Sequence, residues 1–218
     1  MIYERTLPDD PIRQGDIFVG LPRVDFSLEK LPVVDNGEVE ERAWTEVLGD
    51  GTNTIAAVVG IRPVMAIVIT QDCDAIRAAQ ITLCEVRAFA DVERSAKDTK
   101  SPKSWMDRIT QQAKKNLKWF YLPQDTSYGI AGKMAVDFQV TLSVTRLDLE
   151  SLRMKRIGRL NSVADEHFRE RLSEFFRRYP VDEWYALDSD ELAKYKEQYP
   201  EVVPFPWQSP AEHNGPSE

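Results

Sequence analysis

The 218-residue sequence has only two cysteines and two histidines, and neither pair has the spacing of a zinc site. It also lacks the phosphate-binding glycine loop, the Gly-x-Gly-x-x-Gly dinucleotide motif, the Gly-x-Ser-x-Gly elbow and any internal repeat. These absences argue against nucleotide-cofactor enzymes and serine hydrolases. We therefore expect no cofactor and no bound metal.

Long hydrophobic runs are missing as well. The longest, Val64–Thr70, has the length of a strand, far below the roughly 18 residues of a membrane span. The N-terminus has neither the basic nor the apolar region of a secretion signal. Cys73 and Cys84 are then expected to stay reduced, and the sequence predicts a cytoplasmic protein with no membrane partner.

Acidic residues outnumber basic ones, and the formal net charge is −8. The segment from 94 to 118 is the exception, because eight basic residues there stand against two acids. Such a segment is typical of phosphate contacts, and a solvated helix face is the alternative. Trp105 lies in this segment and Trp119 directly follows it, and we expect their rings to stack on unpaired bases. The predicted RNA-binding residues are Lys103, Arg108, Lys114, Lys115 and Lys118.

Hydrophobic periodicity predicts an α+β fold. Alternating or β-branched residues indicate strands at Ile17–Leu21, Ile55–Val59, Val64–Thr70, Ile81–Phe89, Met134–Arg146 and Lys155–Leu160. Helical spacing indicates helices near 101–121, 162–179 and 189–198, and a short helical turn at 148–152. Ser162 is the expected N-cap of the helix at 162–179. Residues 27–54 read as a long irregular hairpin connection, and the proline-rich residues 200–218 as a tail.

The joining segments suit hairpins and insertions rather than parallel crossovers. We therefore expect one strongly curved antiparallel sheet that contains Gly15–Leu21, Val64–Thr70, Ile81–Ala88 and Met134–Val144.

The segment from 60 to 74 carries the most chemistry. An Arg62-Pro63 step stands at the entrance of its apolar strand, where proline is tolerated. Four residues with reactive or ligating side chains, Gln71-Asp72-Cys73-Asp74, stand at its exit. We interpret the two ends of this strand as the best candidates for a site.

Three interpretations of the group at 71–74 remain open. Asp72 and Asp74 are spaced to hold a hard cation, with Glu85 as a further acidic residue. A thiolate nucleophile at Cys73 needs a base, for which His167 is the candidate. The third interpretation is an acidic turn whose carboxylates cap nearby backbone N–H groups.

Short motifs recur in a recognisable order: Gly15-Asp16-Ile17-Phe18, then Gly60-Ile61-Arg62-Pro63-Val64, then Val140–Val144, Asp148-Leu149 and Arg156–Leu160 before a helix. This order resembles the MazF/PemK (Kid-like) toxins over roughly residues 14–178, with insertions at 27–54 and near 92–133. The resemblance implies a compact SH3-like β-barrel, usually dimeric, that cleaves single-stranded RNA without metal.

Within this resemblance, Arg62 matches the family's arginine at the scissile phosphate. An always-charged planar guanidinium suits a transferring phosphate better than lysine does. The family's second catalytic residue, a Ser or Thr late in the next strand, has no clear counterpart. Glu85-Val86-Arg87 occupies that region, without a hydroxyl.

The leading hypothesis is a MazF-like RNA-binding protein or metal-independent endoribonuclease of a toxin or defence system. Its catalytic residues are expected to be Arg62 at the phosphate, with Gln71, Asp72 and Asp74 around it. The alternative is a catalytically inactive barrel that acts as a protein-interaction or regulatory module. The expected partner is single-stranded RNA or an antitoxin-like or regulatory protein, and a homodimer is compatible with either hypothesis.

The expected domain organisation has three parts. An SH3-like small antiparallel barrel with an inserted helix near 101–121 takes up residues 1–160. A C-terminal helical extension follows at 161–199, and the tail at 200–218 ends the chain.

Overall fold

The structure, a computed structural model, describes residues 2–48, 55–93, 101, 104–107, 109, 116–177, 189–198 and 200. The chain divides into two compact units, Met1–Phe176 and Arg177–Glu218. All described strands belong to the first unit. The described residues of the second are Arg177, Pro200 and helix α7 (Ser189–Gln198), which the sequence predicts. Of the tail predicted at 200–218, all residues after Pro200 lie outside the described residues.

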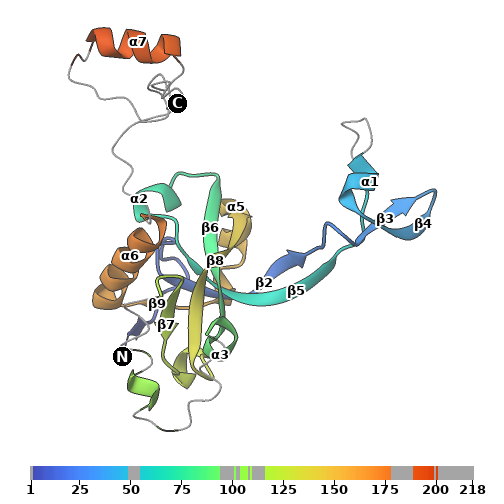
Figure 1. Cartoon of the computed structure of the whole chain (residues 1–218). Helices are drawn as coiled ribbons and strands as arrows, with labels where there is room; N and C mark the ends of the chain where they lie inside the picture. The colour runs from blue at the N-terminus through green and yellow to red at the C-terminus, as the bar shows by residue number, and fades with distance from the viewer. Residues whose placement is uncertain are drawn as a thin grey trace, which may run out of the picture. The chain divides into compact units, whose positions relative to one another are not determined.

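The body of the first unit is an antiparallel sheet of seven strands that curls into a half-barrel (Figure 1). The α+β class and the single curved antiparallel sheet are therefore confirmed. The order across the sheet is β1-β9-β2-β5-β6-β8-β7. The strands are β1 (Tyr3–Glu4), β2 (Asp16–Asp25), β5 (Gly60–Val68), β6 (Gln80–Ala88), β7 (Trp119–Leu122), β8 (Met134–Thr145) and β9 (Arg156–Leu160).

Helices cover the sheet, and alternation along the strands supplies an apolar core to each face. On β5, Ile67 joins the core that contains Phe168 of α6 (Ser162–Phe176), whereas Ala66 joins the one that contains Leu149. Leu149 belongs to α5 (Arg146–Ser151). Further short helices of the body are α2 (Asp72–Ala75), α3 (Phe89–Val92) and the 3-10 turns Thr126–Tyr128 and Arg153–Lys155.

Strands β2 and β5 run on past the sheet as a two-stranded ribbon (Figure 1). Within β2, only Asp16–Phe18 pairs with β9, and β6 pairs with β5 from Met65 onward, so Pro22–Asp25 and Gly60–Pro63 pair only with each other. The ribbon leads to a head made of β3 (Leu31–Asp35), β4 (Glu38–Arg42) and α1 (Trp44–Leu48). We call residues 22–48 and 55–63 the arm.

The arm corrects two predictions. The long hairpin connection predicted at 27–54 is not irregular throughout its described part, because residues 31–42 form the regular β3–β4 hairpin. Ile55–Val59 is not a strand: its ladder contact is a single bridge from Ala57 to Val33. Backbone bonds from Val34 to Ala56 and from Val58 to Pro32 hold this segment beside β3.

Two helix predictions also change. In the range 101–121, residues 104–107 and 109 are helical, but Trp119–Leu122 is strand β7. Its aromatic residues point to opposite faces, with Trp119 against Phe89 and Phe120 against Phe168, as a strand requires. Ser162 begins α6, and its N-cap is the preceding Asn161, whose side-chain oxygen accepts from the Ala164 N–H at 2.9 Å.

Candidate functional site

Arg62 lies on β5 at the base of the arm, within a cluster of ion pairs. It stands directly opposite Arg23 of β2, so both guanidinium groups occupy one face of the ribbon. Glu85 of β6 is buried at 3% exposure and accepts two hydrogen bonds from Arg62, at 2.9 and 3.1 Å, and another from Arg23. Asp25 accepts from the Nε atoms of both arginines, each at 2.7 Å.

This cluster occupies most of the bonding capacity of Arg62. Three of its five N–H groups already donate to carboxylates. The hydrogen bond from Arg62 holds the pKa of Asp25 below its usual value, and the bonds to Glu85 and Asp25 raise the pKa of Arg62. A phosphate at Arg62 would bind through the two remaining N–H groups, beside two carboxylates that repel it.

A shallow hollow of about 390 Å³ opens beside the cluster. Its charged lining consists of Arg62 and Arg87 against Glu85 and Asp91, so the formal charges cancel. Arg87 also pairs with Asp137 of β8, which is nearly buried, at 3.2 Å. The hollow therefore suits a polar ligand of mixed charge better than a polyanion.

The second candidate group lies at the other end of β5. Asp72 begins α2 and accepts from the Gln14 backbone N–H at 2.8 Å and from Arg169 of α6 at 2.7 Å. Asp74 points elsewhere, because it pairs with Arg77 at 2.9 Å on the surface. Gln71 is exposed and its side chain gives no cap to α2. Asp72 is thus a tether between α2, α6 and the loop before β2.

Strand β5 separates the predicted catalytic residues. From Arg62 to Val68 the chain is extended, and a rise of about 3.3 Å per residue puts roughly 20 Å between them. Gln71, Asp72 and Asp74 follow beyond Val68. The structure therefore does not bring these three side chains to the phosphate that Arg62 was expected to hold.

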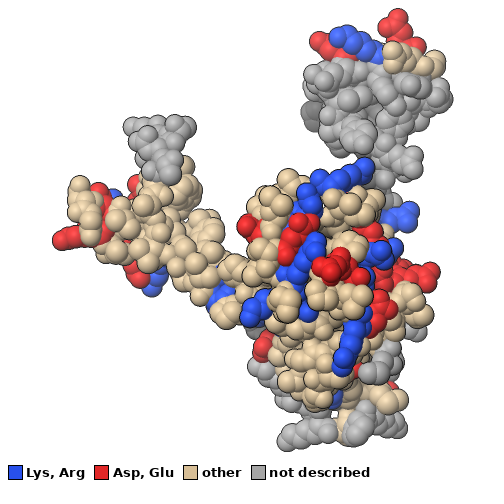
Figure 2. Space-filling model, turned by 180° about the vertical axis from the view of Figure 1, so that it is seen from behind, with Lys and Arg blue, Asp and Glu red and all other residues tan. Residues whose placement is uncertain are grey.

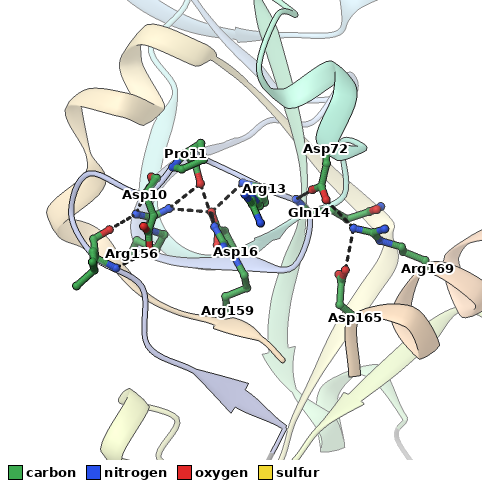
Figure 3. A network of polar contacts seen from close by, with 11 residues as sticks. Asp10, Pro11, Arg13, Gln14, Asp16, Asp72, Arg156, Arg159, Asp165 and Arg169 are labelled. Atoms are coloured by element: carbon green, nitrogen blue, oxygen red, sulfur yellow. Dashed lines mark hydrogen bonds and ion pairs between the residues drawn. The ribbon is translucent and has the colours of Figure 1, made fainter. Parts of the chain in front are cut away.

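The Gly-Asp motif at the start of β2 forms a buried clamp (Figure 3). The carboxylate of Asp16, which is inaccessible to solvent, accepts from the Arg13 N–H at 2.9 Å and from Arg156 at 3.0 Å. It also accepts from Arg159 at 2.5 and 3.1 Å. The Arg156 guanidinium in turn donates to the carbonyl oxygens of Leu7, Asp10 and Pro11. The clamp thus fixes the N-terminal loop onto β9.

Asp165 of α6 sits next to this clamp with one oxygen unsatisfied. Its Oδ2 pairs with Arg169 at 2.8 Å, while its Oδ1 is buried without a hydrogen-bond partner. Burial raises the pKa of this carboxyl above its usual value, although Arg169 opposes the shift. A Cβ at position 15 would lie 2.9 Å from Oδ1, which explains the glycine there.

Little of the predicted RNA-binding segment is described. Lys103, Arg108, Lys114 and Lys115 lie outside the described residues. Lys118 is half-buried, and its backbone oxygen accepts from the Phe138 N–H. The stacking role expected for Trp119 is wrong, because its ring is 1% exposed and packs edge-on against Phe89. Trp105 packs against the same ring.

His167 and Cys73 do not come together in the described structure. His167 contacts the Phe120 ring and lines a largely apolar pocket of about 610 Å³ between β7 and α6. Cys73 is exposed on α2, and its thiol lies 4.0 Å from the Gln71 side-chain oxygen. The aromatic run 119–121 that borders this pocket is plain in the sequence, but nothing in the sequence predicts the pocket itself.

No protein-family model and no curated protein sequence matches this chain. The resemblance to the MazF/PemK toxins therefore rests on the short motifs alone. Among the described residues, no three His, Cys, Asp or Glu side chains are grouped so that they could hold a metal ion. None of the described helices is both long and apolar enough to cross a membrane.

Proposed function

We propose that this protein is a protein-interaction module, which is the second of the two hypotheses, that of a catalytically inactive barrel. One observation carries the proposal: nine of the sixteen large hydrophobic side chains exposed in the described residues lie on the arm. Clusters of this kind mark interaction surfaces, whereas isolated exposed hydrophobics need no explanation. The nine are Val24, Phe26, Leu28, Val34, Val39, Trp44, Leu48, Val58 and Ile61.

The build of the arm supports the same function. Among its described apolar residues, Leu31 and Val33 alone are buried, so its head has very little core of its own. A two-stranded hairpin is at best marginally stable in water, and a partner that covers the head would stabilise it. The body beneath it has full apolar cores and supplies a rigid base.

The arm also offers a clean test. Asp25 and Gly60 pair directly across the ribbon, so an Asn-Gly turn can replace residues 26–59 and leave the body intact. We expect this headless variant to keep its thermal unfolding transition. It should lose a partner that the full chain retains in cells and that binds again when both proteins are purified. A partner that binds the headless variant equally well would refute the proposal.

Cleavage of single-stranded RNA without metal is the second candidate. It is supported by the hollow beside Arg62, where Arg87 adds a second cation and, in this proposal, the buried Glu85 acts as general base. In this proposal the half-barrel is a MazF-like, SH3-like barrel, cytoplasmic and dimeric, regulated by an antitoxin-like protein. Both candidate functions use the same body, and they differ in whether Arg62 can contact a phosphate.

The test of the second candidate is RNA cleavage by the purified chain in the presence of a chelator. Loss of a positioned phosphate contact should cost about a hundredfold or more, so Arg62→Ala should abolish measurable cleavage. Arg77→Ala is the matched control, because Arg77 pairs with one exposed carboxylate on the body. Intact RNA with the unmodified chain would remove this candidate and leave the interaction module.

A further inference from the structure

The ribbon of the arm has one apolar and one charged face. Direct cross-strand partners share a face, so Val24 with Ile61 and Pro22 with Pro63 lie on one side. The Arg23–Arg62 pair lies on the other, with Glu85. Val24 is 46% and Ile61 65% exposed, and both prolines are exposed. We call Pro22, Val24, Ile61 and Pro63 the ribbon face.

The two prolines restrict how a partner can approach. A proline cannot donate a hydrogen bond to an added strand, and proline is a common device against edge-to-edge pairing. Pro22 and Pro63 stand on opposite strands of the ribbon, so each of its open edges carries one. The available mode is therefore side-chain docking on the ribbon face rather than addition of a strand.

The head next to this face is acidic. Its described residues, 26–48 and 55–59, carry six carboxylates against two cations, a net charge of −4. Glu38 and Glu41 on β4 make no ion pair among the described residues, and all but the last residue of β4 are exposed. Figure 2 shows mostly uncharged surface along the arm, with red carboxylates at its outer end.

We propose that the arm docks a protein whose binding face has an apolar centre and a rim of lysine or arginine. This inference rests on the proposed function and adds the chemistry of the partner. The negative charge of the head favours this partner over two others. RNA and the acidic head of a second copy would both be repelled, whereas a basic rim is attracted and steered to the head. The apolar centre covers the ribbon face and supplies most of the affinity.

The first step of the test identifies the partner by position. A benzophenone amino acid at Ile61 is activated by light in cells, with the same probe at Leu147 as control. Leu147 is 71% exposed and lies on α5 of the body, so it samples an apolar site away from the arm. The expected result is a protein that crosslinks from 61 and not from 147, with a net positive contact surface.

The second step measures affinity with the identified partner, purified, against the full chain. Val24→Thr with Ile61→Thr should weaken binding about tenfold or more, because central apolar contacts dominate interfaces. Thr keeps the strand propensity and the sites are exposed, so the fold is unaffected. Leu147→Thr should change nothing.

The basic rim is tested by charge. Glu38→Gln with Glu41→Gln should weaken binding about threefold to tenfold at low salt and much less at 0.5 M salt, where exposed charges are screened. Glu166→Gln with Glu170→Gln on α6 is the matched control. If the affinity changed neither with salt nor with the Glu38 and Glu41 substitutions, the partner would have no basic rim. The proposed interaction function would still stand if the headless variant lost the partner. Crosslinking to RNA, to a second copy, or to nothing specific at 61 would overturn the inference itself.

Discussion

Removing the charge of Asp16 should destabilise the body strongly without touching either candidate surface. The carboxylate is inaccessible to solvent and accepts four hydrogen bonds, three of them from Arg156 and Arg159. In Asp16→Asn, one acceptor oxygen becomes an NH₂ group that faces these guanidinium groups. The side chain of Arg156, at 1% exposure, then stays buried without its counter-charge.

The cost follows from the geometry. Breaking a buried ion pair from one side costs about 3–5 kcal/mol, because the remaining charge is left desolvated. Arg156 still donates to three carbonyl oxygens, so we expect a value of about 3 kcal/mol. That is a large part of the roughly 5–15 kcal/mol by which domains are stable. The exposed Asp74–Arg77 pair should be worth about 0–1 kcal/mol.

Urea unfolding followed by circular dichroism provides the measurement. With a slope of about 2 kcal/mol per molar urea, the Asp16→Asn midpoint should fall by roughly 1.5 M. Asp74→Asn makes the same chemical change at an exposed pair and should shift the midpoint by less than about 0.5 M. Equal midpoints for the two variants, with unchanged slopes, would refute the idea that Asp16 is the centre of a buried clamp.

Three further outcomes are expected. At pH 8 in the native protein, iodoacetamide should label one thiol, the exposed Cys73, and a second only in urea, because burial raises the pKa of Cys84 to about 12. Gly15→Ala should lower the free energy of unfolding by more than the roughly 1–2 kcal/mol that an alanine costs in the left-handed conformation, because its Cβ also meets Asp165. Gly20→Ala has open space around its Cβ and should cost only that conformational energy. The raised pKa of Asp165 means that the folded state holds this proton more tightly than the unfolded state. The free energy of unfolding should therefore fall as pH rises above the ordinary value of 3.8 towards the folded pKa. Urea midpoints measured across this pH range should show the fall in the unmodified protein and not in Asp165→Asn.

The sheet was predictable because its strands carry their own signal. Gln80–Ala88 and Met134–Thr145 agree with the predicted strands to within a residue at each end, since period-two alternation is a local property. The prediction of a helix at Trp119–Leu122 was wrong for a related reason. Its aromatic residues fit the end of a helical pattern begun at Trp105, and only the pairing with β8 made it a strand.

The arm was not predictable in this way. Residues 27–54 show turn signals and mixed polarity, which hid the local β3–β4 pairs, and the ribbon pairs that carry the head, such as Val24 with Ile61, are far apart in sequence. The same holds for the clamp. Asp16 looks like the start of a strand, and the arginines that bury it follow 140 residues later. The Gly-Asp motif is recognisable in the sequence, but the two arginines that bond to Asp16 are not.

The partners of Arg62 are also distant in sequence, and they change the interpretation of this residue. A Gly-x-Arg-Pro step indicates a phosphate contact only if the guanidinium faces an empty site. Here Asp25, 37 residues before it, and Glu85, 23 residues after it, both bond to it. With Arg23 included, the cluster has two positive and two negative charges, so an approaching phosphate meets no net attraction. At the base of a projecting ribbon, such a neutral and rigid cluster holds β2, β5 and β6 together. Its position favours mechanical support of the arm over chemistry on RNA.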